Sequence, residues 1–501
     1  AVFAYLATVP GPQAEEMAGL FARLWNPRHP LHEDAMRLRM YDDFRCMETP
    51  GRRTLLESVA ATQPQPAPPI NGCWVKPWAG LTIARGETWS VAIKGWSQYI
   101  WDFECHPALW SSREQNVFSR LISNGTVQVM LERKAGEKDA SAVDSRAPGT
   151  ELDHGWDWSR WPGSTATHLP LDRLYNRDES WQNRWFSDET FLGGVGSADG
   201  QAVFAVKLHD TCHDPSFRAT KSWFLFGHEI VCLGSGISCS DAEAATQTTL
   251  FQCYLPDAPA MPIEVDGEAH ATLPWQIRQS ESVTRILDPY RNGFVVPAGQ
   301  PLHIARQPQT SRDANNIRDT AGDYAVAWID HGPAPSDQNY EYAMLVQTTP
   351  QQLADFADDP PYRVLQRDEH AHIVQHTRHD AIGYAIFTAE REITHGPLAR
   401  TDTPVTAFAK PMPDGGLLFR VADPDLRLPR KGNLGFLTPE DEQQLREPHR
   451  VRLLLHGRWL TDAQTPAALH KYNDDQTLLE WEAAVGLPLE LELRPWAESL
   501  G

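Results

Sequence analysis

The hydrophobic residues of this chain change their spacing once, and that change limits the folds open to it. Before residue 60 they recur three and four positions apart, as Met17, Leu20 and Phe21 do, which is the period of an amphipathic helix. The segment 60–71 is then rich in proline, which is excluded from helix interiors and central strands. Beyond it the hydrophobic residues alternate with a period of two, which is typical of β-strands. The sequence therefore predicts a short helical part followed by a long β part.

Several individual elements can be placed from these patterns. A second stretch of helical spacing lies near the N-terminus, where Met36, Met40 and Phe44 are four residues apart. A short helix is expected at Pro350–Ala357. The clearest alternating runs, which we expect to be strands, begin at Leu81, Trp89, Val127, Ala202, Gly416, Arg450 and Leu489.

The length of the chain implies more than one domain. A chain of 501 residues exceeds what one compact core usually holds, so two or three domains are expected. We predict a helical segment at 1–68, a large antiparallel β-sandwich at 69–395 and a smaller C-terminal β-sandwich at 396–501. The predicted fold class is therefore mainly β.

Charge and composition narrow the range of partners. A net charge of −21 argues against nucleic acid or an anionic membrane, and an acidic polysaccharide would need a local basic cleft. No apolar run approaches membrane-spanning length and no signal segment is visible, and since the chain starts with Ala1 we expect a processed or truncated chain. Most of the 18 tryptophans are expected in cores, while exposed ones could stack on sugar rings. The seven cysteines are not paired at metal-binding spacing, so we expect mostly buried thiols.

One segment carries a strong family resemblance. HGWDWSRWPGSTATHLPLDRL, starting at His154, resembles the W-D-W-x-R-x-P-G-x-T-x-x-H-L-P-L segment of polysaccharide lyase family 8, the family of chondroitin and hyaluronan lyases. Further matching segments follow in the same order, starting at Phe217, Thr248, Ala327 and Tyr362. The resemblance runs from about Ile70 to the C-terminus and implies a β-supersandwich with a smaller β-sandwich after it. The helical start resembles the last turns of the family's α/α toroid.

The resemblance also implies a chemistry. Members of the family cleave the hexosamine–uronic acid bond by β-elimination: a base removes the C5 proton of the uronate, the C4 substituent leaves, and an unsaturated sugar forms. Asn or Arg neutralises the uronate carboxylate, and a Tyr assisted by His, Arg and Glu moves the protons. The family's Tyr, His and Arg lie in the toroid, and no matching segment is found in residues 1–60. The expected partners are an acidic polysaccharide and that toroid, which could be a separate or a cleaved chain; the expected location is secreted or periplasmic.

Only the catalytic Glu of that set is expected in the β part, and Glu104 is the first choice because it ends a predicted strand in the family's position. Glu114 is the second choice, since an apparent insertion after Glu104 places Pro107 where the family usually has Asn. Either glutamate could instead be a solvated loop carboxylate. The residues that we predict to contact the substrate near this glutamate are Asn116, Arg113 and Arg120.

Two other groups of residues have both a structural and a functional interpretation. His154 and Arg160 could contact substrate, although Trp156, Trp158 and Trp161 around them have the spacing of core residues and Arg160 could pair with Asp157. The histidines at His209-x-x-Cys212-His213 and His370-x-His372-x-x-x-His376 have spacing like that of metal ligands, but structural or surface roles are favoured.

No nucleotide-binding or serine-hydrolase motif occurs, and no cofactor or metal is predicted. Two functions stay open: a lyase that works with a toroid, and a non-catalytic carbohydrate-binding or interaction module. A hydrolase would need two facing carboxylates, and no such pair can be identified.

Overall fold

In the computed structural model the chain divides into two compact units, one containing the N-terminal helices and the other the β-sheets. The structure describes residues 2–25, 50–68, 70–105, 116–131, 148–175, 184–428, 438, 449–461, 466–484 and 486–496. The second helical stretch predicted near Met36 and Met40 lies outside these residues.

The helical unit is built from α1 (Val2–Thr8), α2 (Ala14–Leu24) and α4 (Pro50–Ala61). Helix α2 forms where the spacing of Met17, Leu20 and Phe21 predicted it. Two acidic residues lie in its first turn, where their negative charges interact favourably with the helix dipole. Phe21 packs with Ala4 of α1 and with two side chains of α4 in a small core. The proline-rich segment follows α4 and lies along α2, since the Ala67 amide donates to the Gly19 carbonyl.

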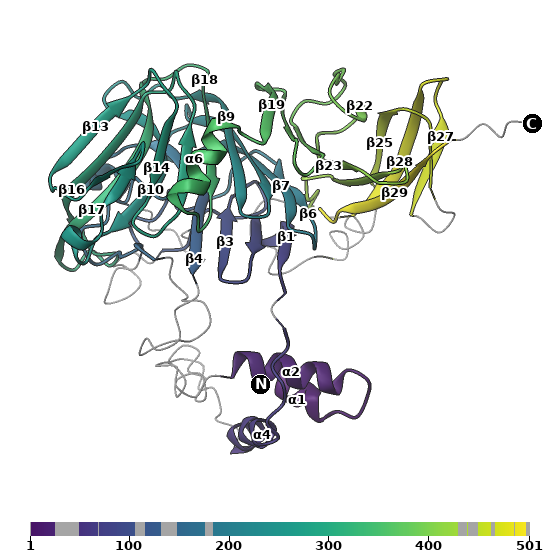
Figure 1. The fold of residues 1–501 in the computed structure, drawn as a ribbon, viewed down its shortest axis with the longest axis horizontal. Coiled ribbons are helices and arrows are strands. Elements are labelled where there is room, and N and C mark those ends of the chain that lie inside the picture. The colour runs from purple at the N-terminus through teal and green to yellow at the C-terminus, as the bar shows by residue number, and fades with distance from the viewer. Residues whose placement is uncertain are drawn as a thin grey trace, which may run out of the picture. The chain divides into compact units, whose positions relative to one another are not determined.

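The β unit contains two large sheets that pack face to face. The nine-stranded sheet has the order β12 (Glu268–His270), β11 (Ile263–Val265), β14 (Thr284–Leu287), β15 (Gly293–Val296), β18 (Gln338–Leu345), β9 (Glu229–Ser238), β8 (Arg218–Phe226), β7 (Gln201–His209) and β6 (Leu192–Gly196). The five-stranded sheet has the order β13 (Trp275–Gln279), β16 (Leu302–Arg312), β17 (Asp319–Pro333), β10 (Ala245–Tyr254) and β5 (Thr165–Thr167). Their inner faces meet through contacts such as the one between the rings of Phe251 and Phe294, whose centroids lie 5.1 Å apart. Figure 1 shows the strands of the two sheets beside each other.

Short elements close this sandwich. A four-stranded sheet contains β1 (Gly72–Lys76), β2 (Leu81–Arg85), β3 (Trp89–Lys94) and β4 (Thr126–Leu131), while α5 (Leu171–Leu174) and two 3-10 turns (Pro77–Ala79 and Ala258–Ala260) lie in connections. The predicted helix is α6 (Pro350–Asp358), and Thr349 and Gln352 form a capping box at its start. Its buried Leu353 and Phe356 join the core of the nine-stranded sheet.

The C-terminal part is a second, smaller sandwich. Its seven-stranded sheet has the order β19 (Tyr362–Arg367), β20 (Ala371–His376), β21 (Ala381–Ile386), β23 (Val405–Pro411), β24 (Leu417–Ala422), β29 (Leu489–Pro495) and β26 (Trp459–Leu460). Its four-stranded sheet has the order β22 (Leu398–Thr401), β25 (His449–His456), β28 (Gln476–Ala483) and β27 (Ala467–Lys471). Alternate residues of β25, β28 and β29, such as Leu453, Leu479 and Leu491, are buried between the two sheets.

The mainly antiparallel β fold predicted from the sequence is confirmed, with strands at each of the positions where alternation was clearest. Strands β19, β20 and β21 belong to the seven-stranded sheet, because β21 pairs with β23 along Ile382–Ile386. The domain boundaries themselves stay predictions.

Candidate functional site

Glu104 lies in an irregular segment of the β unit, and the prediction that it ends a strand is wrong. Strand β3 ends at Lys94, and Ser97 then starts a turn in which its amide donates to the Ile100 carbonyl. The backbone that follows runs beside residues 185–189, since the Asp102 amide donates to the Trp185 carbonyl at 3.1 Å. These contacts bring Glu104 next to a segment that is distant in sequence.

The buried carboxylate of Asp102 fixes this juxtaposition. Its Oδ1 accepts the backbone N–H of Phe103 at 2.6 Å and that of Trp185 at 3.1 Å. The rings of Phe103 and Trp185 stack with centroids 5.5 Å apart. Burial raises the pKa of the Asp102 carboxyl well above its usual value. A buried acceptor with two donors from different segments locks both segments in place.

The side chain of Glu104 is held by an arginine that sequence reasoning missed. Its Oε1 accepts a hydrogen bond from Arg184 at 2.7 Å, and the guanidinium of Arg184 also lies over the ring of Trp101, 4.7 Å from its centroid. Glu104 retains 46% side-chain exposure and Arg184 29%, so the pair faces solvent. Trp101 is also exposed, as a sugar-stacking tryptophan would be. No sequence pattern links Arg184 to Glu104, although Trp101 is a close sequence neighbour of the glutamate.

Glu104 and Asn116 line one cavity of about 500 Å³. Asn116 adopts a positive φ of 57° and its side-chain amide donates to the Glu104 carbonyl at 3.4 Å. Lys94 also lines the cavity, and burial lowers its pKa to about 8. The structure thus brings two of the predicted site residues together, with a cation and the buried Asp102 beside them. A partly apolar cavity with a few polar side chains is typical of a ligand site.

The remaining predicted site residues lie elsewhere. Arg120 lines a different cavity, and Arg113 and Glu114 lie outside the described residues. His154 is exposed and its ring lies 4.8 Å from that of Tyr254.

Arg160 is buried, and two of its donor nitrogens have partners within the fold. Its Nε donates to Gln247 at 3.0 Å, and its NH1 pairs with Asp157 at 2.9 Å. The guanidinium lies 3.9 Å from the centroid of the Trp328 ring. These contacts explain why an arginine is buried here even if it binds no ligand. Its role in substrate binding stays a prediction.

The tryptophans of the W-D-W-x-R segment belong to the core. Trp156, Trp158 and Trp161 are each at most 2% exposed and pack with Tyr324 of the five-stranded sheet. Their alternation in sequence therefore reflects burial rather than a sugar platform.

The histidines with metal-like spacing have protein partners. His209 pairs with Asp188 at 2.5 Å, His372 bonds to two serine hydroxyls, and His376 bonds to Glu229 at 2.7 Å. Across the described part of the chain, no group of three or more His, Cys, Asp or Glu side chains could hold a metal ion. Five of the six described cysteines are buried, and Cys212 is exposed. Within the same described residues, no helix is long and apolar enough to cross a membrane.

Comparison with known sequences gives a consistent set of matches. Residues 80–357 match the family profile described as polysaccharide lyase family 8, super-sandwich domain. The chain is 28% identical over 504 residues to chondroitin sulfate ABC exolyase of Bacteroides thetaiotaomicron, covering 96% of this chain and 46% of that protein. It is 25% identical over 427 residues to chondroitin sulfate ABC endolyase of Proteus vulgaris, covering 82% of this chain and 38% of that protein. The chain thus spans less than half the length of these relatives.

Solved structures share the fold. A Paenibacillus xanthan lyase superposes with a TM-score of 0.72 at 16% identity, covering 100% of this chain and 44% of that one. Chondroitin AC lyase of Streptomyces coelicolor A3, solved in complex with chondroitin sulphate, gives a TM-score of 0.70 at 17% identity, covering 99% of this chain and 58% of that one.

Proposed function

This chain belongs to polysaccharide lyase family 8, and from that premise we propose that it is the β portion of a glycosaminoglycan lyase that acts on chondroitin or dermatan sulfate or on hyaluronan. The proposed reaction is β-elimination at the hexosamine–uronic acid bond. The C5 proton and the C4 substituent leave, and no water is added. The observation that carries the proposal is Glu104, which is held by Arg184 at 2.7 Å and lines a cavity with Asn116.

We propose that Glu104 is a positioning residue. The two groups that move protons in this reaction, a Tyr and a His, would come from an α/α toroid outside the 501 residues. The support is that the chain spans only 46% of the exolyase relative. A carboxylate at the edge of such a site can orient and neutralise an Arg–Tyr–His cluster. Asn116 can donate to the uronate carboxylate, whose charge must be offset before C5 loses its proton.

Substrate size supports the proposed location. A long polyanion cannot cross a lipid bilayer unaided, because charged groups are expensive in hydrocarbon. An enzyme that degrades such a polymer therefore meets it outside the cell or in the periplasm.

The test is an elimination assay on chondroitin sulfate, read as ultraviolet absorbance of the new double bond. The isolated 501-residue chain should show little or no turnover, and the chain combined with its toroid should release unsaturated products. Strong turnover by the chain alone would contradict the placement of the catalytic groups. Binding without elimination in the combined sample would favour a carbohydrate-binding module instead.

A further inference from the structure

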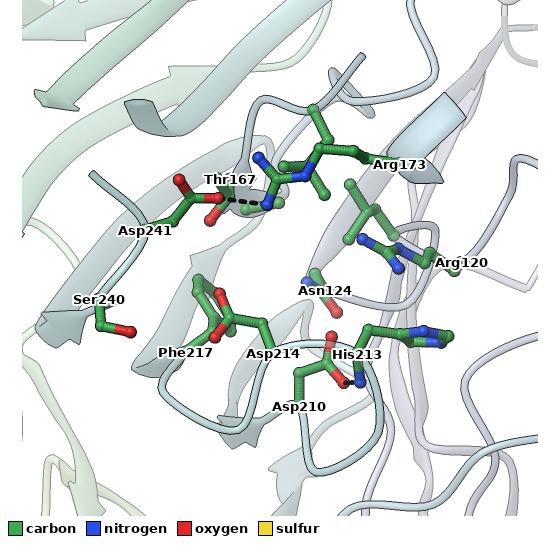
Figure 2. Close-up of a pocket in the computed structure, with 13 residues that line it drawn as sticks. Arg120, Asn124, Thr167, Arg173, Asp210, His213, Asp214, Phe217, Ser240 and Asp241 are labelled. Carbon is green, nitrogen blue, oxygen red and sulfur yellow. Dashed lines mark hydrogen bonds and ion pairs between the residues drawn. The ribbon is translucent and has the colours of Figure 1, made fainter. Parts of the chain in front are cut away.

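A second cavity of the β unit, of about 260 Å³, has no part in the proposed reaction. The turn segment 116–125 contributes different side chains to the two cavities: Asn116 and Ser119 to the one with Glu104, and Arg120 and Asn124 to this one. Figure 2 shows the guanidinium of Arg120 pointing into the pocket, with Arg173 reaching it from α5. We call it the Arg120 pocket.

Arg120 is a half-buried cation with an unusual environment. In the part of the chain that the structure describes, it forms no ion pair within 4.0 Å, and its buried Nε has no hydrogen-bond partner. Burial lowers the pKa of its guanidinium below the usual value, and the charges of the nearby carboxylates, of which Asp210 has the largest effect, offset this only in part. The other arginine of the pocket, Arg173, does have a counter-charge, since it pairs with Asp241 at 2.5 Å. Burying a cation without a bonded counter-charge is costly, and a bound anion would remove that cost.

Three carboxylates line the same pocket, and of their six oxygens only Oδ2 of Asp210 lacks a hydrogen-bond donor among the described residues. Asp210 accepts the backbone N–H groups of Cys212 and His213, and Asp241 accepts those of Glu243 and Ala244 as well as Arg173.

Asp214 accepts both the amide and the hydroxyl of Ser216, and its other oxygen accepts the Cys239 thiol at 3.1 Å. A cation at Asp214 or Asp241 would compete with these donors, and a cation anywhere in the pocket would face two guanidinium groups. An anion would find the donors of Arg120 available.

We infer that the Arg120 pocket binds an oxyanion, and specifically a sulfate group of a sulfated polysaccharide. A guanidinium presents paired N–H donors that match two oxygens of a sulfate. Asn124 lines the same pocket, but its side-chain amide already donates to the Thr165 carbonyl at 3.4 Å, so Arg120 carries the recognition. The volume lies just below the range of small-molecule pockets, roughly 300–1,000 Å³, and suits no more than one sulfated sugar residue. Only the source of the sulfate rests on the proposed function; the oxyanion site does not.

The test is a thermal-shift titration of the full chain with sodium sulfate against sodium chloride at equal ionic strength. Because sulfate raises Tm non-specifically as well, the readout is the difference between variants: Arg120→Gln should weaken the apparent sulfate affinity tenfold or more. The matched control is Arg450→Gln, since Arg450 is exposed on β25 and lines neither cavity, and it should behave as wild type. Equal effects of sulfate and chloride on the wild type, or an unchanged sulfate response in Arg120→Gln, would overturn the site.

A second arm identifies the anion by calorimetry with sulfated and unsulfated chondroitin hexasaccharides. Arg120→Gln should weaken binding of the sulfated one and leave the other unchanged; an equal loss for both would overturn sulfate in favour of a carboxylate. If Arg120→Gln does not fold, Arg173→Gln should weaken sulfate binding several-fold, and no change would refute the pocket. Neither measurement requires turnover, so this inference and the proposed elimination can fail separately.

Discussion

At the scale of single residues, Arg184 orients the carboxylate of Glu104. Replacing Arg184 with Gln should lower kcat of the assembled enzyme about tenfold, or about 1.4 kcal/mol, because Glu104 loses the donor at 2.7 Å that orients it. An exposed ion pair contributes only about 0.2–1 kcal/mol to stability, so the thermal unfolding midpoint should change little. The measurement is kcat and KM beside a melting curve.

The matched control is Arg218→Gln, which breaks a comparably exposed pair with Glu189 at 3.4 Å. It should leave kcat unchanged, and Arg184→Lys should restore part of the lost rate. A loss of stability in Arg184→Gln with unchanged kcat would show a purely structural arginine.

His372 makes a prediction about pH. Burial, with a contribution from nearby Arg367, lowers its pKa from 6.5 to about 3, and its ring lies between the hydroxyls of Ser222 and Ser235. In the unfolded chain the imidazole of this histidine binds a proton as the pH falls through about 6.5, whereas in the folded chain it stays neutral until the pH is near 3. The contribution of His372 to the free energy of unfolding is therefore fully present above pH 6.5. It is lost as the pH falls toward 3, by about 1.4 kcal/mol per pH unit.

Urea denaturation between pH 7 and 4 measures this slope. His372→Gln should flatten it, whereas His228→Gln, at an exposed turn, should not. An identical slope in wild type and His372→Gln would show that other groups cause the acid sensitivity.

At the scale of elements, the loop that carries His154 crosses the hairpin of β16 and β17 at two glycines. A Cβ at Gly322 would overlap the carbonyl oxygen of His154, and a Cβ at Gly155, whose φ is 90°, would lie 2.5 Å from the carbonyl oxygen of Gln309. Gly322→Ala should therefore destabilise the β unit by about 1–3 kcal/mol, because backbone atoms cannot move aside as a flexible side chain can. The free energy of unfolding in urea measures it. Ala321→Ser, at the exposed neighbouring position, is the control; equal stability of the two variants would contradict the crossing.

At the scale of the whole molecule, the fold could be predicted and the site only in part. In segments such as Leu489–Leu493, hydrophobic and polar residues alternate because one face of the strand is buried. This pattern is local, so it can be recognised in the sequence. The pairing of Glu104 with Arg184 joins residues 80 positions apart, and depends on Asp102 bonding to the Trp185 amide. A contact made by tertiary structure leaves no local pattern in the sequence. For the same reason the sequence could not show that Arg120 and Glu104 line different cavities.

The most direct test of the central claim is the steady-state kinetics of Glu104→Gln in the chain combined with its toroid. We predict that kcat on chondroitin sulfate falls about a hundredfold or more, on the order of 2–4 kcal/mol, with a much smaller change in KM. Glu114→Gln, and Glu243→Gln at an exposed turn, should be nearly silent. An unchanged kcat in Glu104→Gln, or a large loss in Glu114→Gln instead, would contradict the assignment of Glu104.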